Sequence, residues 1–305
     1  MNYRPEIAPP PPSGPLALEW RGFNVPPLRA GVAAHAEVTV RNAGTVTWQP
    51  PDTSKRGILL SFHWLDRFDN PIIWEGERTP IPHALAPGDE ATLATSIRGP
   101  IPPGPYRLTF DLVDEGRCWF AEVGNRPLQL DIDVKPRLVE RTLSAHVMTG
   151  PAELVSATLR ALEKQEEPIQ DEGSIVVHLP PGCVPHASWS RQILDAHDSG
   201  YGVVGGSVRL TGSRFRGRTI RSNLRPWAPP FGRMPNWRLP LVCPSTAPDV
   251  RDWIPIGTPV AGLPTIDMTP HAEPWICDGR IRIDLPIRAA QQVDHLPVET
   301  RSTPA

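Results

Sequence analysis

The first half of the chain consists of short runs in which hydrophobic and polar residues alternate. Residues 36–41 follow a period of two and end at Asn42-Ala43-Gly44, which is a turn sequence. Similar runs, bounded by turn residues, occupy residues 58–65, 72–75, 91–97, 106–113 and 128–134. About seven short strands at regular spacing are typical of an immunoglobulin-like β-sandwich. We therefore expect such a sandwich over residues 16–135.

The hydrophobic pattern changes to a helical period after residue 136. Residues 151–167 and 187–199 each place their apolar residues on one stripe, which predicts two helices. Strands are predicted at residues 174–179 and 202–208, so helices and strands alternate as in an α/β unit with parallel strands. The residues expected on the inner faces of the helices are Leu154, Val155, Leu159, Leu162, Trp189, Ile193, Leu194 and His197. We assign this small, reduced α/β module to residues 137–225.

Proline is the most unusual component of the composition. Proline makes up 40 of the 305 residues, or about 13%, whereas its usual share is about 5%. Because proline breaks helix interiors, this content excludes a helical bundle, a coiled coil and a helical solenoid. The hydrophobic share of 39% excludes wholesale disorder. The sequence therefore predicts a β-rich, two-domain chain with a proline-rich arm at residues 1–15 and an extended Pro/Trp-rich tail at residues 226–305. Within the tail, regular structure is expected only at residues 280–285.

Charge and cysteine content restrict the partners. A net charge of −2 provides no field that would attract nucleic acid, so no nucleic-acid partner is expected. The four cysteines are far apart and have no C-x-x-C spacing, which argues against a zinc site; they are Cys118, Cys183, Cys243 and Cys277. Their scattered positions suit a reducing cytoplasm at least as well as a disulfide framework. The N-terminus has no basic segment followed by an apolar one. We expect a protein without metal or cofactor that is cytoplasmic or peripheral at the inner face of the cell membrane.

Motifs of the first half follow one another in the order and spacing of a known family. They are Val38-Thr39-Val40-Arg41-Asn42-Ala43-Gly44-Thr45, Phe62-His63-Trp64-Leu65-Asp66, Leu85-Ala86-Pro87-Gly88-Asp89 and Pro103-Gly104-Pro105-Tyr106. Residues 18–135 thereby resemble the bacterial Ig-like domain that is often fused to glycosyltransferases and methyltransferases of surface-polysaccharide pathways. The tryptophans are also similar to those of the four-tryptophan Ig-like domain of autophagy receptors; they are Trp48, Trp64, Trp74 and Trp119. Such domains are non-catalytic, so the resemblance implies binding, spacing or docking.

The second half resembles family 2 glycosyltransferases of GT-A fold in two places. These are residues 154–165 and the stretch from residue 176 to residue 208. At the positions of the family's metal-binding Asp-x-Asp, this chain has Pro180 and Gly182, and neither coordinates Mg²⁺ or Mn²⁺. The resemblance therefore implies a degenerate transferase-like segment that lacks the metal site.

Two polar features of this module have alternative interpretations. Asp195, His197 and Asp198 are candidates for a catalytic cluster, but we interpret them as a solvated helix end. The Gly205-Gly206-Ser207 segment is either a phosphate cradle or a point of tight turning or close strand packing, because it lacks the context of a dinucleotide-binding motif.

In the sandwich, several tryptophans and one histidine are candidates either for a binding surface or for the core and scaffold. Exposed tryptophans are typical of carbohydrate-stacking platforms, but a tryptophan in a strand is more often a core residue. We predict that Trp48, Trp64 and Trp119 are core residues. Alternation within residues 58–65 places His63 opposite Phe62 and Trp64, so we expect it on the solvent face.

The candidate interaction residues lie toward the C-terminus. Residues 209–225 contain six arginines and no acidic residue, which indicates either a solvated loop or a surface for phosphate, anionic lipid or an acidic protein. Tryptophans among prolines in the tail are typical of segments that cover either their own domains or a partner. The predicted contact residues are Arg214, Arg216, Arg218, Arg221, Arg225, Trp227, Trp237, Trp253 and Trp275.

Together these features predict a non-enzymatic accessory or scaffold subunit whose Ig-like domain and arms fasten protein subunits of a larger assembly. We expect the host to be a bacterial membrane complex such as a photosynthetic reaction centre–light-harvesting core, approached from the cytoplasm, although no motif identifies it. The alternatives are a glycosyltransferase of surface-polysaccharide synthesis and a carbohydrate-binding module.

Overall fold

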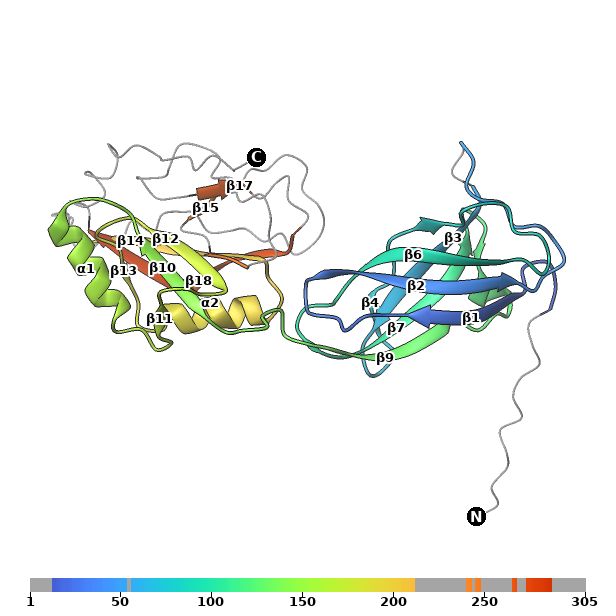
Figure 1. Ribbon diagram of the computed structural model, residues 1–305, viewed down its shortest axis with the longest axis horizontal. Coiled ribbons are helices and arrows are strands. Elements are labelled where there is room, and N and C mark those ends of the chain that lie inside the picture. Colours follow the sequence, from blue (N-terminus) through green and yellow to red (C-terminus); the bar gives the residue numbers. More distant parts are fainter. Residues whose placement is uncertain are drawn as a thin grey trace, which may run out of the picture. The chain divides into compact units, whose positions relative to one another are not determined.

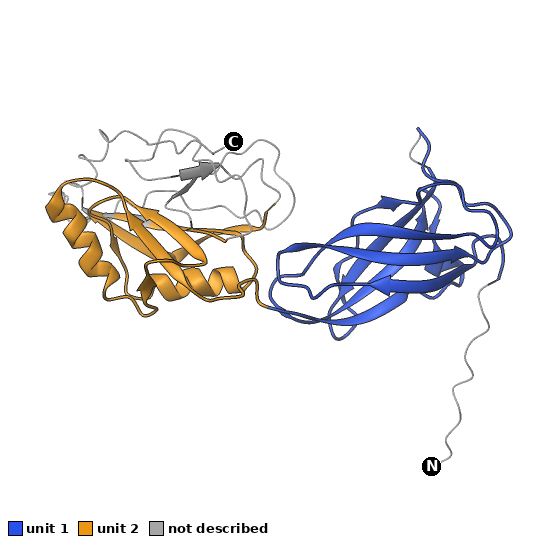
Figure 2. Ribbon diagram, viewed as in Figure 1, with its two compact units in different colours: residues 1–135 blue, residues 136–305 orange. Residues whose placement is uncertain are grey.

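The computed structural model describes residues 13–53, 56–211, 240–242, 245–247, 265–267 and 273–286. The chain divides into two compact units, Met1–Lys135 and Pro136–Ala305 (Figure 2). Most of the predicted proline-rich arm and most of the predicted tail lie outside the described residues.

The first unit is an immunoglobulin-like β-sandwich, as the sequence predicts (Figure 1). One sheet has three antiparallel strands in the order β1 (Leu18–Asn24), β2 (Ala33–Asn42) and β6 (Glu90–Arg98). The other sheet is centred on the antiparallel pair β3 (Ile58–Leu65) and β7 (Gly104–Asp114). Short strands β4 (Pro71–Ile73) and β5 (Thr79–Pro80) pair with β3, while β8 (Cys118–Trp119) and β9 (Leu128–Val134) pair with β7. A 3₁₀ turn, η1 (Phe120–Val123), follows β8.

The core of this unit lies between the two sheets. Trp48 and Trp64 are 1% and 0% exposed, which confirms that both are core residues. Trp48 packs edge-on against Phe120, with ring centroids 5.2 Å apart. Because truncation of a fully buried tryptophan to alanine costs about 3–5 kcal/mol, these two residues are major determinants of stability.

Strand β3 is buried on both of its faces. All eight of its residues are buried, whereas a strand of a two-layer sandwich ordinarily buries only every second residue. The chain after β4 and the chain after β7 therefore cover the outer face of this sheet.

In its described residues, the second unit contains a seven-stranded mixed sheet and two helices. The strand order is β11-β10-β12-β16-β14-β18-β13. The pairs β10/β12 and β14/β18 are parallel, and β16 runs antiparallel between β12 and β14. The elements are β10 (Leu143–Val147), α1 (Ala152–Leu162), β11 (Ile169–Gln170), β12 (Ile175–Leu179), β13 (Val184–Pro185), α2 (Trp189–Asp198), β14 (Val203–Thr211), β16 (Ser245–Thr246) and β18 (Trp275–Pro286), with β15 (Pro240–Val242) and β17 (Thr265–Asp267) as a separate pair. Of the described helices, none is long and apolar enough to cross a membrane.

Helix α2 buries the inner face that the sequence predicts, whereas α1 differs from the prediction. The buried residues of α2 include Trp189, Ile193, Leu194 and His197. Helix α1 ends at Leu162 and buries Thr158, while Leu159 is exposed. The Thr158 hydroxyl accepts a hydrogen bond from the Gly182 amide at 2.9 Å and donates one to the Leu154 carbonyl at 3.3 Å. Thr158, rather than the predicted Leu159, therefore lies on the inner face of α1, because its hydroxyl has both a donor and an acceptor partner there.

Strand β18 includes residues 280–285, where the sequence predicts regular structure, but it is longer than predicted and begins at Trp275. Residues 275–286 pair in parallel with β14 and antiparallel with β13, so they belong to the sheet. At Gly206, an added Cβ would lie 2.2 Å from the Ile281 carbonyl oxygen. Of the two interpretations of Gly205-Gly206-Ser207, the structure supports close strand packing.

Candidate functional site

The layer that covers the outer face of β3 is centred on His63. This residue is 4% exposed, so the prediction that it faces solvent is wrong. Its ring stacks on Trp74, with centroids 4.1 Å apart and planes at 16°, and lies 4.6 Å from the ring of Trp119. Alternation does place His63 opposite its neighbours, but these two tryptophans cover that face.

Trp119 and Trp74 have different surroundings from those of the core tryptophans. Trp119 is half-buried in the outer layer, which corrects its assignment to the core. Trp74 is 52% exposed, although His63 stacks on one face of its ring. The His63 Nδ1 atom is hydrogen-bonded to the Trp74 carbonyl oxygen, and burial lowers the pKa of the imidazole. The Trp74 indole is thus covered by His63 on one face of its ring and is partly exposed to solvent.

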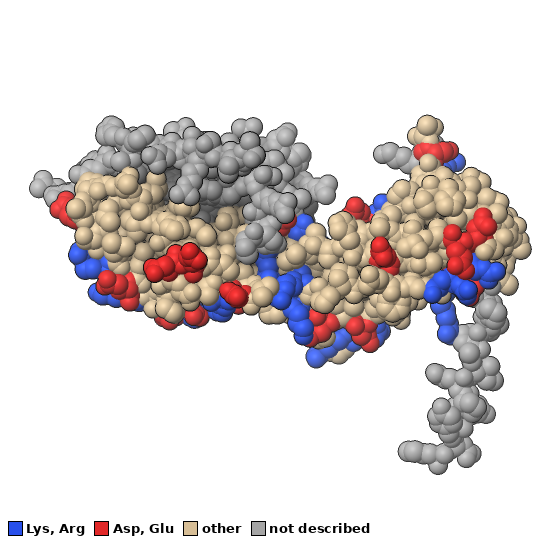
Figure 3. Space-filling model, in the orientation of Figure 1, with Lys and Arg blue, Asp and Glu red and all other residues tan. Residues whose placement is uncertain are grey.

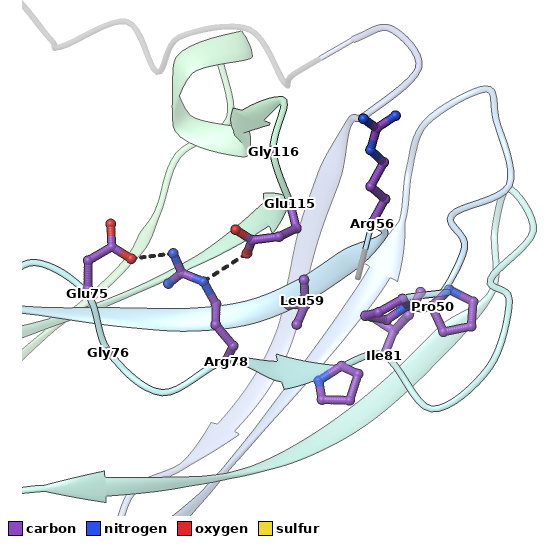
Figure 4. Close-up of a pocket in the computed structure, with 11 residues that line it drawn as sticks. Pro50, Arg56, Leu59, Glu75, Gly76, Arg78, Ile81, Glu115 and Gly116 are labelled. Carbon is purple, nitrogen blue, oxygen red and sulfur yellow. Dashed lines mark hydrogen bonds and ion pairs between the residues drawn. The ribbon is translucent and has the colours of Figure 1, made fainter. Parts of the chain in front are cut away.

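Arg78 connects this aromatic cluster to two carboxylates. Its guanidinium lies over the Trp119 ring, 4.6 Å from the centroid, and Nη1 donates to the Ser61 hydroxyl at 2.6 Å. Nε donates to Glu115 at 3.1 Å, and Nη2 pairs with Glu75 (Figure 4). The side chain of Arg78 is therefore fixed by four contacts, and Figure 4 shows it between the two glutamates.

A groove of about 880 Å³ lies beside the Arg78 cluster. Its apolar lining includes Leu59 and Ile81, and its charged lining consists of Arg56, Arg78, Glu75 and Glu115; the remaining lining residues are Pro50, Pro51, Gly76, Pro80 and Gly116 (Figure 4). This volume is within the usual range for ligand sites, about 300–1,000 Å³. Two basic and two acidic side chains make the lining neutral in sum.

The hairpin that joins β3 to β4 carries exposed apolar side chains. Phe68 is 69% exposed and Ile72 is 45% exposed, and Ile73 is exposed as well. Asp66 fixes the turn, because its carboxylate accepts hydrogen bonds from the amides of Phe68 at 2.8 Å and Asn70 at 2.9 Å. Since β4 is at the end of the strand order, the hairpin presents an ordered, apolar sheet edge. We call Phe68, Ile72 and Ile73 the hairpin patch.

In the predicted polar cluster of α2, the two aspartates form ion pairs, whereas the histidine is buried. Asp195 and Asp198 bind Arg141, which also binds Glu167 at 3.1 Å. His197 is fully buried, so it is not part of a solvated helix end. Its Nε2 atom is 2.8 Å from the hydroxyl of Ser245, and its Nδ1 atom is 2.8 Å from the Tyr201 carbonyl oxygen. Burial lowers the pKa of His197 to about 3.

Pro180 and Gly182 form a turn after β12. Gly182 has φ of 88°, and its amide donates to Leu154 and Thr158. Among the described residues, no group of three or more His, Cys, Asp or Glu side chains is placed to hold a metal ion. The described cysteines, Cys118, Cys183 and Cys277, are free thiols.

Of the predicted contact residues, only Trp275 is among the described residues. It is half-buried at the start of β18 and pairs with Val203. Arg209, at the start of the arginine run, is bound to Asp284 with an Nε to Oδ1 distance of 2.9 Å, so it has a counter-charge that sequence order does not reveal. The others lie outside the described residues; they are Arg214, Arg216, Arg218, Arg221, Arg225, Trp227, Trp237 and Trp253. In Figure 3, acidic and basic side chains of the described residues are interspersed on the visible face.

A platform of exposed tryptophans is an alternative that the sequence raises, but neither Trp74 nor the groove beside Arg78 is predicted. The signal for Trp74 is nevertheless present in the sequence. Trp74 ends the apolar run Ile72-Ile73-Trp74 and is followed at once by Glu75-Gly76-Glu77. A short apolar run between a turn and a charged segment indicates an edge strand, where large side chains remain accessible.

Comparisons with known proteins give β-sandwich domains at low similarity. No family model matches the sequence, and no curated protein does. Solved structures that are similar include a CARDB domain from Pyrococcus furiosus, at 16% identity over 38% of this chain and 83% of that one, with a TM-score of 0.22. A PapD-like domain of human CEP192 is similar at 13% identity over 44% of this chain and 94% of its own, with a TM-score of 0.23. A family 123 glycoside hydrolase from Clostridium perfringens is similar at 11% identity over 45% and 27%, with a TM-score of 0.22. Similarities of this size assign neither a family nor a function to the chain.

Proposed function

We propose that this protein is a non-enzymatic accessory subunit that fastens protein subunits of a larger assembly, and that it docks through the hairpin patch. The observation that carries the proposal is the exposure of Phe68, Ile72 and Ile73 on one ordered edge hairpin. The partner is a protein subunit with an apolar surface of its own.

An exposed apolar edge is a feature that proteins normally avoid, because free strand edges pair with other chains. Here three large apolar side chains lie within six residues. The Asp66 turn fixes the backbone at Phe68 and Asn70, and the pairing of β4 with β3 fixes Ile72 and Ile73, which face opposite sides of this sheet edge. Phe68 alone exposes 69% of its surface, and covering about 140 Å² at about 25 cal/mol/Å² is worth about 3 kcal/mol. An apolar surface that is already ordered loses little conformational entropy on binding, which favours docking.

The polar clusters of the second unit support a structural role for that unit. Arg141 neutralises the carboxylates of Asp195 and Asp198, and the His197–Ser245 pair is buried on all sides. No arrangement of the described residues favours the glycosyltransferase alternative.

The proposal is tested by the mass of the native particle that contains the tagged full-length chain. We expect the wild type to be in an assembly of fixed stoichiometry much heavier than the 33.6 kDa chain. The triple variant Phe68→Ser, Ile72→Thr, Ile73→Thr is expected to run as the free chain. The matched control is Val139→Thr, which changes an exposed apolar residue of the second unit; it should remain in the assembly.

Two results would overturn the proposal. One is a wild-type chain that is a monomer in native extracts. The other is a triple variant that remains in the assembly with unchanged stoichiometry while its thermal unfolding matches that of the wild type.

A further inference from the structure

We infer that the exposed face of Trp74, together with the groove beside Arg78, is a binding site for a neutral carbohydrate chain. This inference goes beyond the docking role, because it uses a different set of side chains from the hairpin patch and a different class of ligand. It rests on the geometry of the Trp74 ring, the charges of the groove and the volume of the groove.

The Trp74 ring is arranged as a stacking platform. Sugar rings bind to aromatic side chains by placing their C–H faces on an accessible π-face, so the aromatic ring must be exposed and must not turn. His63 stacks on Trp74 at 4.1 Å and 16°, and Trp119 meets it at 64° with centroids 6.5 Å apart. Two neighbouring rings thus immobilise the indole while 52% of the residue remains exposed.

The hydrogen-bonding groups for sugar hydroxyls come from the groove, whose lining does not include Trp74 itself. The Trp119 ring connects the two, because it contacts both Trp74 and the Arg78 guanidinium. Glu75 directly follows Trp74 in the chain, and Glu75 and Glu115 each direct one carboxylate oxygen, Oε2, to Arg78. Both glutamates are exposed at the groove, so the second oxygen of each is able to accept from a hydroxyl group. Because the Arg78 bonds fix these planar groups, little side-chain entropy is lost when they bind a ligand.

The charges of the groove select an uncharged, polar ligand. Arg56 and Arg78 balance Glu75 and Glu115 in the lining, so neither an anion nor a cation is favoured. A purely apolar ligand would bury the Arg78 ion pairs without replacing their solvation, which is unfavourable. A neutral sugar chain offers an apolar ring face for Trp74 and hydroxyls that both donate and accept for the glutamates and Arg56. The groove volume of about 880 Å³ accommodates more than one sugar ring.

The inference is tested by affinity electrophoresis of the full-length chain in native gels that contain laminarin, xylan, galactomannan or pullulan. We expect at least one polysaccharide to retard the wild type. Trp74→Ala should weaken that binding at least tenfold, and Trp74→Tyr should retain most of it. The matched control is Phe23→Ala, which removes an equally exposed aromatic ring from β1 in the other sheet.

A second variant tests the inference even if Trp74→Ala fails to fold. Glu75→Gln changes an exposed carboxylate and should reduce binding about three- to tenfold while thermal unfolding is unchanged. The triple hairpin-patch variant should still bind the polysaccharide, which separates this inference from the docking role. The inference is wrong if none of the four polysaccharides retards the wild type, or if Trp74→Ala is retarded as strongly as the wild type. It is also wrong if a proline-rich peptide, and no polysaccharide, binds in a Trp74-dependent way.

Discussion

Acid should destabilise the second unit through His197. The imidazole is fully buried, and desolvation lowers its pKa from 6.5 to about 3. In the unfolded chain the same group titrates near pH 6.5. Below pH 6.5 the unfolded state therefore binds a proton at His197, whereas the folded state binds it only near pH 3. The free energy of unfolding consequently falls as the pH is lowered through this range.

The magnitude follows from the two pKa values. Between pH 7 and pH 5, protonation of the unfolded state removes about 2 kcal/mol of stability, and the limit near pH 3 is about 5 kcal/mol. A loss of this size is a large part of the stability of a typical domain. The contribution is local to α2 and β16, because His197 is bonded to Tyr201 and Ser245.

Hydrogen exchange of the intact chain measures this effect at the amides of α2 and β14. The informative variant is His197→Asn, whose amide keeps a donor for the Tyr201 carbonyl but does not titrate. We expect it to be less stable than the wild type at pH 7 and to lose about 2 kcal/mol less between pH 7 and pH 5. All other groups are the same in both proteins, so the difference isolates His197, and His146→Asn on the exposed face of β10 is the control. Equal losses in the wild type and in His197→Asn would refute the reasoning.

Two further substitutions have outcomes that the structure specifies. Burial raises the pKa of Asp111 to about 6, so the stability that its protonated form provides at low pH is lost as the pH rises through 6. Between pH 4.5 and pH 8 the wild type should therefore lose about 2 kcal/mol more stability than Asp111→Asn, which does not titrate; equal losses of the two proteins in thermal unfolding would contradict this. The two pH values are compared because the Asp111 carboxylate also accepts from the amides of Leu112 at 2.8 Å and Ala121 at 3.1 Å, and the asparagine amide has one acceptor fewer at either pH. Gly206→Ala should destabilise the β14–β18 pair by more than about 2 kcal/mol in urea unfolding, because the new Cβ would meet the Ile281 carbonyl at 2.2 Å. Gly279→Ala, where nothing lies within 4 Å, is the matched control, and equal effects at the two glycines would show that the close approach is not the cause.

The elements that the sequence predicts well are those that depend on local pattern. The alternation of the first half identifies the strands of the sandwich, and the general tendency of tryptophan to be buried in such strands correctly predicts Trp48 and Trp64 as core residues. The apolar stripe of α2 identifies its inner face, including His197. These predictions succeed because one buried face is enough to explain each pattern.

The elements that the sequence predicts poorly depend on partners that are distant in the chain. Thr158 replaces Leu159 on the inner face of α1 because the Gly182 amide, 24 residues away, bonds to its hydroxyl. The sequence predicts regular structure at residues 280–285 but not that residues 275–286 join the sheet, because the strand they pair with lies about 70 residues earlier. No local period carries this information.

The error at His63 and the candidate carbohydrate site have the same origin. Alternation states correctly that His63 lies on the outer face of β3, but it does not state what covers that face. The cover comes from the segments after β4 and after β7, which bring Trp74, Arg78 and Glu115 over the sheet. A covering layer of this kind requires no periodic pattern of hydrophobic residues in the sequence, because its side chains are fixed by stacking and ion pairs rather than by burial alone. The cover leaves Trp74 half exposed, although burial of the whole ring would be more stabilising. This unrealised stabilisation is the reason why we propose the outer layer, rather than the core, as the place of ligand binding.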